Sequence, residues 1–394
     1  MQSLTSSDHP QPTRGRWIWL LSGTLTIGAI GAFGSFAIVR AVDPPNGPLP
    51  MIAVPTRTVT VVQPVSSLNV QSYGAPIKVT TAPGGPVRIV ESITYTPGNG
   101  GPPRVIHTDA HGLLTLAAPA CATGNCSVGF SVTVPSGVTV NASASGGGVT
   151  LVGTGAADVD SGGGQVYAAG ISGPLTVTAD GGGITVNNVG NADLDSGGGP
   201  VTTTNITGNL TVHAEGGGVT VSRAPEASID SGGGPVYAAS ISGPLTVNAE
   251  GGGVTVTGAG ATQIDSGGGP VTASTIQGSL GVAAEGGGVQ ASGVTGALDI
   301  DTGGGPLSAT SLNSPSAVIH GEGGGVALAF LTAPATVRVD TGGGNASLSM
   351  PGGPYAVSAD TGGSEESVLI ATNPSAASSI SVTTEGGNLQ IGPS

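Results

Sequence analysis

The sequence has little of what an ordinary globular enzyme is built from. Of its 394 residues, 3% are aromatic and 8% are charged, whereas charged residues make up about 25% of a typical soluble domain. Lysine occurs once, as Lys78, and from Gly146 onward 19 acidic residues stand against Arg223 and Arg338. Because phosphate contacts need clustered Lys and Arg, this composition argues against nucleic acid as a partner.

Cysteine is equally scarce, with Cys121 and Cys126 in "CATGNC" as the only two. In an oxidising compartment the short turn between them would let a disulfide clip two strands together. A metal site needs more ligands than this pair, and the five histidines are scattered. We therefore expect a disulfide here, and no metal or other cofactor.

One long uncharged run, Trp17–Val39, predicts a single transmembrane helix, since its 23 residues suffice to cross a bilayer. Arg14 and Arg16 precede it, which places the tail 1–16 in the cytoplasm and everything after residue 40 outside the cell membrane. The alternative is a signal peptide cleaved near Val39-Arg40-Ala41, which would make the protein secreted.

Residues 40–57 are rich in proline and predict a stiff stalk. From 58 to 145, short alternating runs such as "PVRIVESITY" and "SVGFSVTVP" are separated by Gly, Pro and Asn turns and show no helical period. We expect an N-terminal β region that caps the domain following it.

Glycine triplets dominate residues 146–394. Twelve copies of "GGG" occur, the first of them at Gly146, and two further copies near the C-terminus are degenerate, "GGS" and "GGN". A shorter and a longer spacing between successive copies alternate, and both become irregular toward the C-terminus. The result is a double repeat of about 35 residues, with a short strand and a turn about every nine residues. This pattern predicts an all-β fold, a single-stranded β-solenoid. We favour a coil of roughly 16 to 19 residues, which spans one triplet spacing, over a coil of roughly 35 residues.

Each triplet is predicted to mark the same corner in successive coils, where the backbone needs φ > 0 or has no room for a Cβ. The acid before the triplet, as in Asp230-Ser231-Gly232 or Glu250-Gly251, would accept hydrogen bonds from the corner amides as an Asx-type turn. The corners are thus interpreted as scaffold.

The alternative for these acids is calcium binding, because stacked carboxylates near glycine turns are hard oxygen ligands. Its candidate ligands are Asp230, Glu250, Asp265 and Glu285. However, the calcium β-roll pattern places its Asp two residues after the last Gly, and here each triplet is followed by Pro-Val, Val-Thr or similar residues.

Catalytic hypotheses are weaker. Three acid pairs lie at i, i+2 on one predicted strand face: Asp158/Asp160, Asp193/Asp195 and Asp299/Asp301. These pairs recur as part of the repeat, and the aromatic residues of the chain are too few for a sugar-stacking groove. The cluster "HTDAH", His107 to His111, is interpreted as an exposed loop, and Glu365 and Glu366 as a solvated bulge. We assign no catalytic residue.

Two stretches resemble a known family: "FSVTVPSGVTVNASASGGGVTL" from Phe130 to Leu151, and "DSGGGPVYAASISGPLTVNAEGGGVTVTG". They are similar to the bacterial adhesin-like proteins with head GIN-type β-strand repeats, over roughly Thr58 to Ser394. This chain has Gly where the family often has the second Ser of its turns, and Pro, Gln or Val where an Asp follows. The resemblance implies a β-helix on the cell envelope, with an adhesive or envelope-stress role and no shared catalytic residues.

The leading hypothesis is a membrane-anchored, surface-exposed, adhesin-like β-helix that acts as a non-catalytic binding or spacer module. Its expected partners are the membrane, through residues 17–39, and an envelope polysaccharide or surface protein. Two alternatives stay open: a carbohydrate-active β-helix enzyme, either a polysaccharide lyase or a hydrolase, and an accessory protein of an envelope-stress system.

Overall fold

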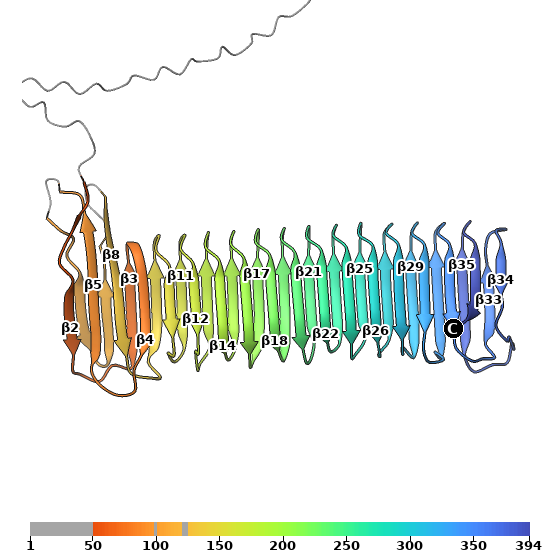
Figure 1. The fold of residues 1–394 in the computed structure, drawn as a ribbon, viewed down its shortest axis with the longest axis horizontal. Helices are drawn as coiled ribbons and strands as arrows, with labels where there is room; N and C mark the ends of the chain where they lie inside the picture. The colour runs from red at the N-terminus through yellow and green to blue at the C-terminus, as the bar shows by residue number, and fades with distance from the viewer. Residues whose placement is uncertain (1–49, 98–100, 120–124) are drawn as a thin grey trace, which may run out of the picture. The chain divides into compact units, whose positions relative to one another are not determined.

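The computed structural model describes residues 50–97, 101–119 and 125–394. They form one stack of β-strands that runs along a single axis (Figure 1). These ranges contain no helix, so none of them offers a helix that could cross a membrane. The tail 1–16, the predicted transmembrane segment 17–39 and the first part of the stalk lie outside the described residues.

The strands form two sheets, which we call sheet A and sheet B. Sheet A contains β1 (Ile52–Ala53), β2 (Arg57–Val61), β4 (Gly74–Thr81), β5 (Val87–Tyr95), β8 (Cys126–Val134), β10 (Val149–Val152), β12 (Val166–Ala169), β14 (Ile184–Val189), β16 (Val201–Ile206), β18 (Val219–Ala224), β20 (Val236–Ile241), β22 (Val254–Ala259), β24 (Val271–Ile276), β26 (Val289–Val294), β28 (Leu307–Leu312), β30 (Val326–Phe330), β32 (Ala346–Met350), β34 (Glu366–Val368) and β36 (Leu389–Pro393). Sheet B contains β3 (Ser67–Ser72), β6 (Ile106–Ala110), β7 (Leu113–Ala117), β9 (Thr139–Ala144), β11 (Ala157–Ser161), β13 (Leu175–Ala179), β15 (Ala192–Ser196), β17 (Asn209–Ala214), β19 (Glu226–Ser231), β21 (Leu245–Ala249), β23 (Thr262–Ser266), β25 (Leu280–Ala284), β27 (Leu298–Thr302), β29 (Ser316–Gly321), β31 (Thr336–Thr341), β33 (Ala356–Asp360) and β35 (Ser379–Thr384).

Each coil of the solenoid contributes one strand to each sheet. Ile184 pairs with Val201 and Val201 pairs with Val219 in parallel register, so one coil separates each residue from its partner. The prediction of one coil per triplet spacing is therefore confirmed, and the alternative coil of twice that length is wrong. The longer sequence repeat corresponds to two coils.

The core lies between the two sheets and consists of small and branched aliphatic side chains. Strand after strand shows the burial alternation of a half-buried strand, as in Leu175–Ala179, where Leu175, Val177 and Ala179 are buried and Thr176 and Thr178 are exposed. Because inward side chains stack on their equivalents in the next coil, each coil buries its apolar side chains only when neighbours are present.

The glycine corner is a place where one coil's backbone rests directly on the backbone of the previous coil. A Cβ added to Gly182, Gly217 or Gly252 would lie 2.0 to 2.1 Å from a carbonyl oxygen of the coil before it. These glycines do not have positive φ. Of the two reasons predicted for the triplets, the lack of room for a Cβ is therefore the one that applies here.

The corner is closed by buried hydroxyl groups rather than by the acids. Ser196 Oγ donates to the carbonyl oxygen of Gly199 at 2.7 Å, and Ser231 and Ser266 donate to Gly234 and Gly269 at 3.0 Å. The expected Asx-type turn is wrong for most corners: in the described part of the chain only Asp360 accepts a bond from a corner amide, that of Gly362. An outward-pointing side chain cannot reach back into a corner that an inward-pointing neighbour already fills.

A second irregularity recurs near the end of the strands of sheet A from β10 to β28, where one residue per coil has left-handed backbone geometry. Glycine fills this position in some coils, as at Gly258 and Gly293, but Thr275 adopts φ 58° between them. Left-handed geometry costs a residue with a Cβ roughly 1–2 kcal/mol. Strain of this kind is therefore distributed along the column.

At the N-terminal end the chain order of the coils is inverted. Leu68 in β3 pairs with Val140 in β9 on one side and with Leu114 in β7 on the other, so the first coil lies inside the stack. Parallel stacking thus begins before the first triplet. The outer strands β2, β5 and β6 pair antiparallel to their neighbours and cover this end.

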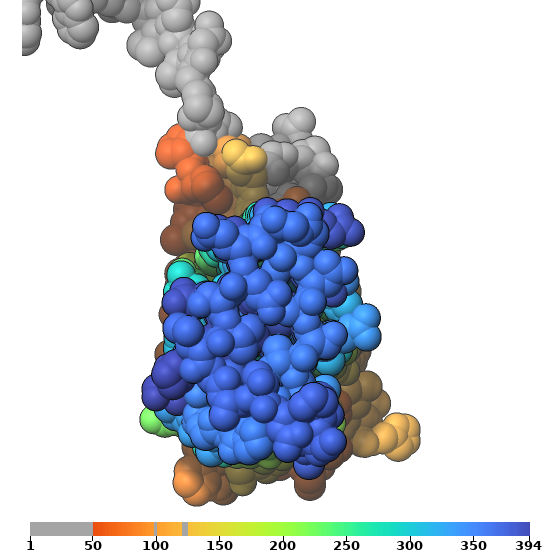
Figure 2. Space-filling view, turned by 90° about the vertical axis from the view of Figure 1, so that its right-hand side faces the viewer, coloured from red at the N-terminus to blue at the C-terminus, as the bar shows by residue number. Residues whose placement is uncertain are grey.

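The C-terminal end shows the same inversion. Ile380 in β35 pairs with both Val337 and Val357, so the last coil of the chain is inserted beneath the preceding one. Figure 2 shows these final coils covering the end of the column. Tyr355 is buried there; its hydroxyl donates to the carbonyl of Pro351, and burial raises its pKa.

This arrangement explains the drift in the last spacings. A Cβ on Gly387 of the "GGN" copy would meet the carbonyl oxygen of Gly344, so that corner follows Gly344 directly in space. The "GGS" coil is outermost, and Glu366 lies on β34, the edge strand of sheet A, rather than in a bulge. Charge on an edge strand discourages pairing with another chain.

We expect Gly217→Ala to destabilise the solenoid by about 2 kcal/mol or more, because its Cβ would overlap the Gly199 backbone. Gly216→Ala is the matched control in the same triplet, since its Cβ would lie 3.5 Å from the nearest atom, the Gly197 carbonyl oxygen, which is an ordinary van der Waals contact. Thermal unfolding followed by circular dichroism measures both. Equal midpoints for the two variants would contradict the stacking explanation.

Thr275→Gly is expected to stabilise the protein by about 1 kcal/mol, because it relieves a left-handed β-branched residue. The reciprocal change Gly293→Thr should destabilise it by a similar amount at the equivalent position. Both are read from chemical unfolding midpoints. A loss of stability in Thr275→Gly would show that the strain is compensated by contacts of the threonine side chain.

Candidate functional site

The outward side of sheet A carries two regular columns of uncharged side chains, which we call the hydroxyl face. The first column, in register from β10 to β28, consists of Thr150, Tyr167, Thr185, Thr202, Thr220, Tyr237, Thr255, Thr272, Gln290 and Ser308. The second column, two residues further along each strand, consists of Val152, Ala169, Asn187, Thr204, Ser222, Ala239, Thr257, Ser274, Ser292 and Thr310.

Neither column contains Asp, Glu, Lys, Arg or His. Arg223 lies at the margin, in the left-handed position after Ser222, where its Nη1 donates to Asn205 Oδ1 at 3.0 Å. Tyr167 and Tyr237 stand in the same column with 41% and 52% of their surface exposed. In the sequence, the aromatic residues are interpreted as too few for a sugar-stacking groove. The sequence signal that these two tyrosines share one column was their recurrence at the same position of the repeat, two double repeats apart.

Prolines border the hydroxyl face at the glycine corner, on alternate coils. Pro270 and Pro306 flank Gly288, and the notch between them is an open cavity of about 370 Å³ that extends to Thr272 and Gln290. The same alternation of proline and glycine recurs at Pro200 and Pro235. The border of this face therefore has a period of two coils.

The outward side of sheet B is acidic. One column places an aspartate on every second coil, with an uncharged residue or a histidine between them, and consists of Asp160, Thr178, Asp195, His213, Asp230, Asn248, Asp265, Ala283, Asp301, His320 and Asp340. The intervening coils carry their acid two residues later, at the corner: Asp180, Glu215, Glu250, Glu285 and Glu322. We call these two columns of acids the acidic edge.

This staggering separates the like charges within each column. Two aspartates in the same column are separated by two coil steps, about 10 Å, rather than by one step of about 4.8 Å. That separation exceeds the Debye length in physiological salt, which is about 8 Å, so much of the repulsion between these aspartates is screened. The two-coil sequence repeat therefore has an electrostatic benefit as well as a steric one.

The four calcium candidates all lie on the acidic edge, with Asp230 and Asp265 in the strand column and Glu250 and Glu285 at the corner. Asp230 and Glu250 line an open depression of about 480 Å³, in which His213 Nδ1 lies 3.5 Å from Asp230 Oδ2. Within the described ranges, no three Asp, Glu, His or Cys side chains are grouped closely enough to hold a metal ion.

The three acid pairs lie as predicted, each on the outward face of one strand. Asp158 and Asp160 are exposed on β11, Asp193 and Asp195 on β15, and Asp299 and Asp301 on β27. Each pair therefore opens onto solvent at a position that the repeat copies. The structure gives the pairs no distinguishing neighbour in register except His213 beside Asp195 and His320 beside Asp301.

The "HTDAH" cluster is not a loop. Residues 106–110 form β6, antiparallel to β7, and His111 with Gly112 makes the turn between them. Asp109 and His111 line a cavity of about 450 Å³ on this turn, whereas His107 points inward to Glu91. The interpretation of the cluster as an exposed loop is therefore wrong for residues 106–110, because the turn at His111 and Gly112 joins two paired strands.

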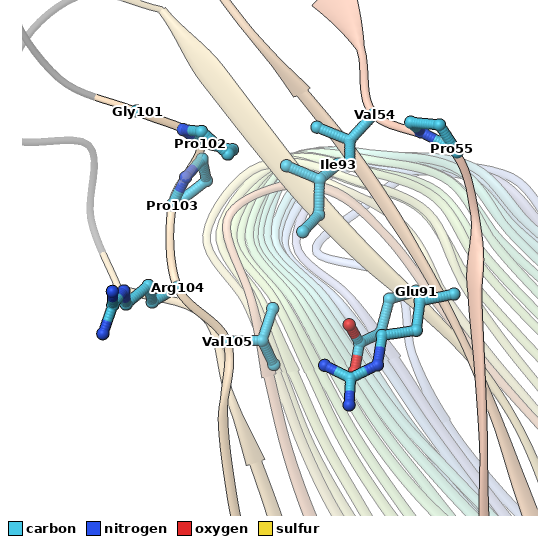
Figure 3. Close-up of a pocket in the computed structure, with 10 residues that line it drawn as sticks. Val54, Pro55, Glu91, Ile93, Gly101, Pro102, Pro103, Arg104 and Val105 are labelled. Atoms are coloured by element: carbon cyan, nitrogen blue, oxygen red, sulfur yellow. The ribbon is translucent and has the colours of Figure 1, made fainter.

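A larger cavity, of about 720 Å³, lies at the same end of the column (Figure 3). Val54 and Ile93 line one side, and Pro103 and Val105 the other. Glu91, which is 5% exposed, lies on the cavity wall, and its Oε1 contacts Nε2 of His107. This is the most deeply buried carboxylate that the structure describes.

Of the two cysteines in the predicted disulfide, Cys121 lies outside the described residues and Cys126 is the first residue of β8. Comparison with known proteins adds little. No protein-family model and no curated protein matches the chain. A crystal structure described as "a putative cell adhesion protein from Clostridium sporogenes" is 10% identical over 86% of this chain and 99% of that chain, with a TM-score of 0.18. A TM-score this low does not establish a shared arrangement of coils.

If the acids are a solvated edge rather than calcium ligands, a chelator will leave the thermal unfolding midpoint unchanged, whereas a ligand bound only to the folded state would raise it. Increasing sodium chloride should raise the midpoint modestly, because salt screens the repulsion along the acidic edge. A midpoint that rises with millimolar calcium, but not with the same ionic strength of sodium chloride, would contradict this assignment.

Proposed function

We propose that this protein is a membrane-anchored, surface-exposed β-solenoid that acts as an adhesin-like, non-catalytic binding or spacer module of the cell envelope. The observation that carries the proposal is the periodicity of its outward side chains. Both the hydroxyl face and the acidic edge repeat with the coils, so they present extended surfaces rather than one singular site.

The geometry of the acids supports a non-catalytic role. A glycosidase places two carboxyl groups on opposite sides of a bound sugar, about 5 to 10 Å apart. Here the two acids of each pair project from the same strand toward the same solvent, as Asp193 and Asp195 do on β15. A substrate lying over them would meet both acids on a single side.

The anchor and orientation rest on sequence: the uncharged run 17–39, preceded by Arg14 and Arg16, would hold the N-terminus in the cytoplasm. The solenoid would then project outward, and its length follows from stacking coils at about 4.8 Å each. An acidic column of this kind is repelled by anionic surfaces and by its own copies, which suits a spacer that keeps its binding face accessible.

Cells or liposomes that carry the full chain are expected to adhere to isolated envelope material better than the same particles without it. Removing residues 17–39 should abolish adhesion of the particles while leaving the released protein folded. The envelope material should show no new reducing or unsaturated ends after incubation. Accumulation of such ends would favour the lyase or hydrolase, and unchanged adhesion would contradict the binding role.

A further inference from the structure

The hydroxyl face has the features of a platform for an extended polymer. Its strands run side by side at a constant spacing, and Tyr167 and Tyr237 are the aromatic side chains of its first column, in which the other side chains are threonine or serine, except for Gln290. The two tyrosines are four coil steps apart, from β12 through β14, β16 and β18 to β20, which is about 19 Å. Between them lie Thr185, Thr202 and Thr220.

This pattern of aromatic and hydroxyl groups matches the surface of a sugar chain. A tyrosine ring offers a flat apolar surface, while its own hydroxyl stays available for a hydrogen bond. Threonine and serine hydroxyls both donate and accept, as do the amides of Asn187 and Gln290 taken as a whole. A pyranose has complementary parts: C–H groups on its faces and hydroxyl groups around its rim.

The charge distribution selects the class of polymer. Between β10 and β28 the two columns of the hydroxyl face carry no ionised group, and the nearest cations are Arg223 at the margin and Lys78, which is paired in register with Thr150. Acids line the sheet B side, so an anionic polymer meets two isolated cations in an otherwise negative field. A cationic polymer would be drawn instead to the acidic edge. A neutral polymer experiences no electrostatic repulsion when it lies on sheet A, so it is the class that this face favours.

The proline border adds a repeat to this platform. Pro270 and Pro306 stand on either side of the notch above Gly288, and the notch continues onto Thr272 and Gln290. Because the prolines recur every second coil, the notches are spaced about 10 Å apart along the axis. A linear polysaccharide with a two-sugar repeat can meet equivalent notches in succession.

From these observations we infer that the hydroxyl face binds a neutral, linear polysaccharide along the solenoid axis, with Tyr167 and Tyr237 as stacking anchors and the threonines between them as hydrogen-bonding partners. This inference rests on the proposed binding function and names the ligand class of that function. It assigns recognition to sheet A and leaves the acidic edge as a solubilising surface.

The test is affinity electrophoresis of the full chain, in detergent, through gels containing pullulan, mannan, a β-1,3-glucan or polygalacturonate. We expect retardation by at least one neutral polymer, none by polygalacturonate, and little change when salt is raised, because no ion pairs are involved. The double variant Tyr167→Ala/Tyr237→Ala should bind about tenfold more weakly or worse, since both aromatic anchors are lost.

The matched control is Thr176→Ala/Thr246→Ala. These residues are also exposed and also stand at one position of the repeat, two double repeats apart, but they point outward from sheet B. They should leave retardation unchanged, and circular dichroism should show that both double variants keep the wild-type unfolding midpoint. Should the alanine variant unfold early, Tyr167→Thr/Tyr237→Thr serves in its place, because threonine occupies the neighbouring positions of the column at Thr185 and Thr220, and it should lose binding to the same extent.

Several results would overturn the inference: no retardation by any neutral polymer, equal retardation of the tyrosine variant, or retardation by polygalacturonate alone. A concentration-dependent dimer that the tyrosine variant disrupts would mean that a second copy of the chain occupies the face. If particles bearing the chain still adhere to envelope material in any of these cases, the binding function stands and only its ligand class is wrong.

Discussion

The structure depends on a backbone-to-backbone contact at the glycine corner. At Gly217, as at Gly182 and Gly252, the space where a Cβ would lie is taken by the main chain of the previous coil. This contact fixes the level of each coil relative to the last, and the strands on either side can then pair in unbroken parallel register. Since every coil satisfies its backbone groups through its neighbours, stability belongs to the stack rather than to any single coil.

The two-coil repeat follows from how the corner alternates. On one coil an inward serine such as Ser231 closes the corner and a glycine takes the next position; on the following coil an alanine and an acid, Ala249 and Glu250, occupy the equivalent positions. A Cβ on Gly232 would lie 2.6 Å from the Glu215 carbonyl oxygen, so the acid cannot occur on both coils without a shift of the backbone. Steric alternation thereby enforces the staggering that also keeps the carboxylates apart.

Much of this architecture could be predicted from spacing alone. The glycine triplets located one corner per coil, and the alternation of Val, Ile and Leu identified the strands. The role of Asp230 was misjudged because the same "D-S-G" triplet permits either side chain to close the corner, and only the direction of the strand decides that Ser231 points inward. The inverted ends were not predictable, because the pairing of Ile380 with both Val337 and Val357 joins segments whose order in space has no local signal.

The position of the proposed binding face illustrates a similar limit. Charged residues draw attention in a sequence with so few of them, and in the strand column of the acidic edge the repeat places an aspartate on every second coil. Tyr167 and Tyr237 occupy a position of the repeat at which the neighbouring coils have threonine, and nothing else in the local sequence distinguishes them. In a solenoid, folding already holds the outward side chains at regular spacing, so binding an extended ligand requires no further ordering of the backbone. A few substitutions in one column are then enough to make a structural surface a binding surface. Because the outward column is separate from the glycine corner, residues of the column can change without disturbing the glycine contacts that hold the stack together.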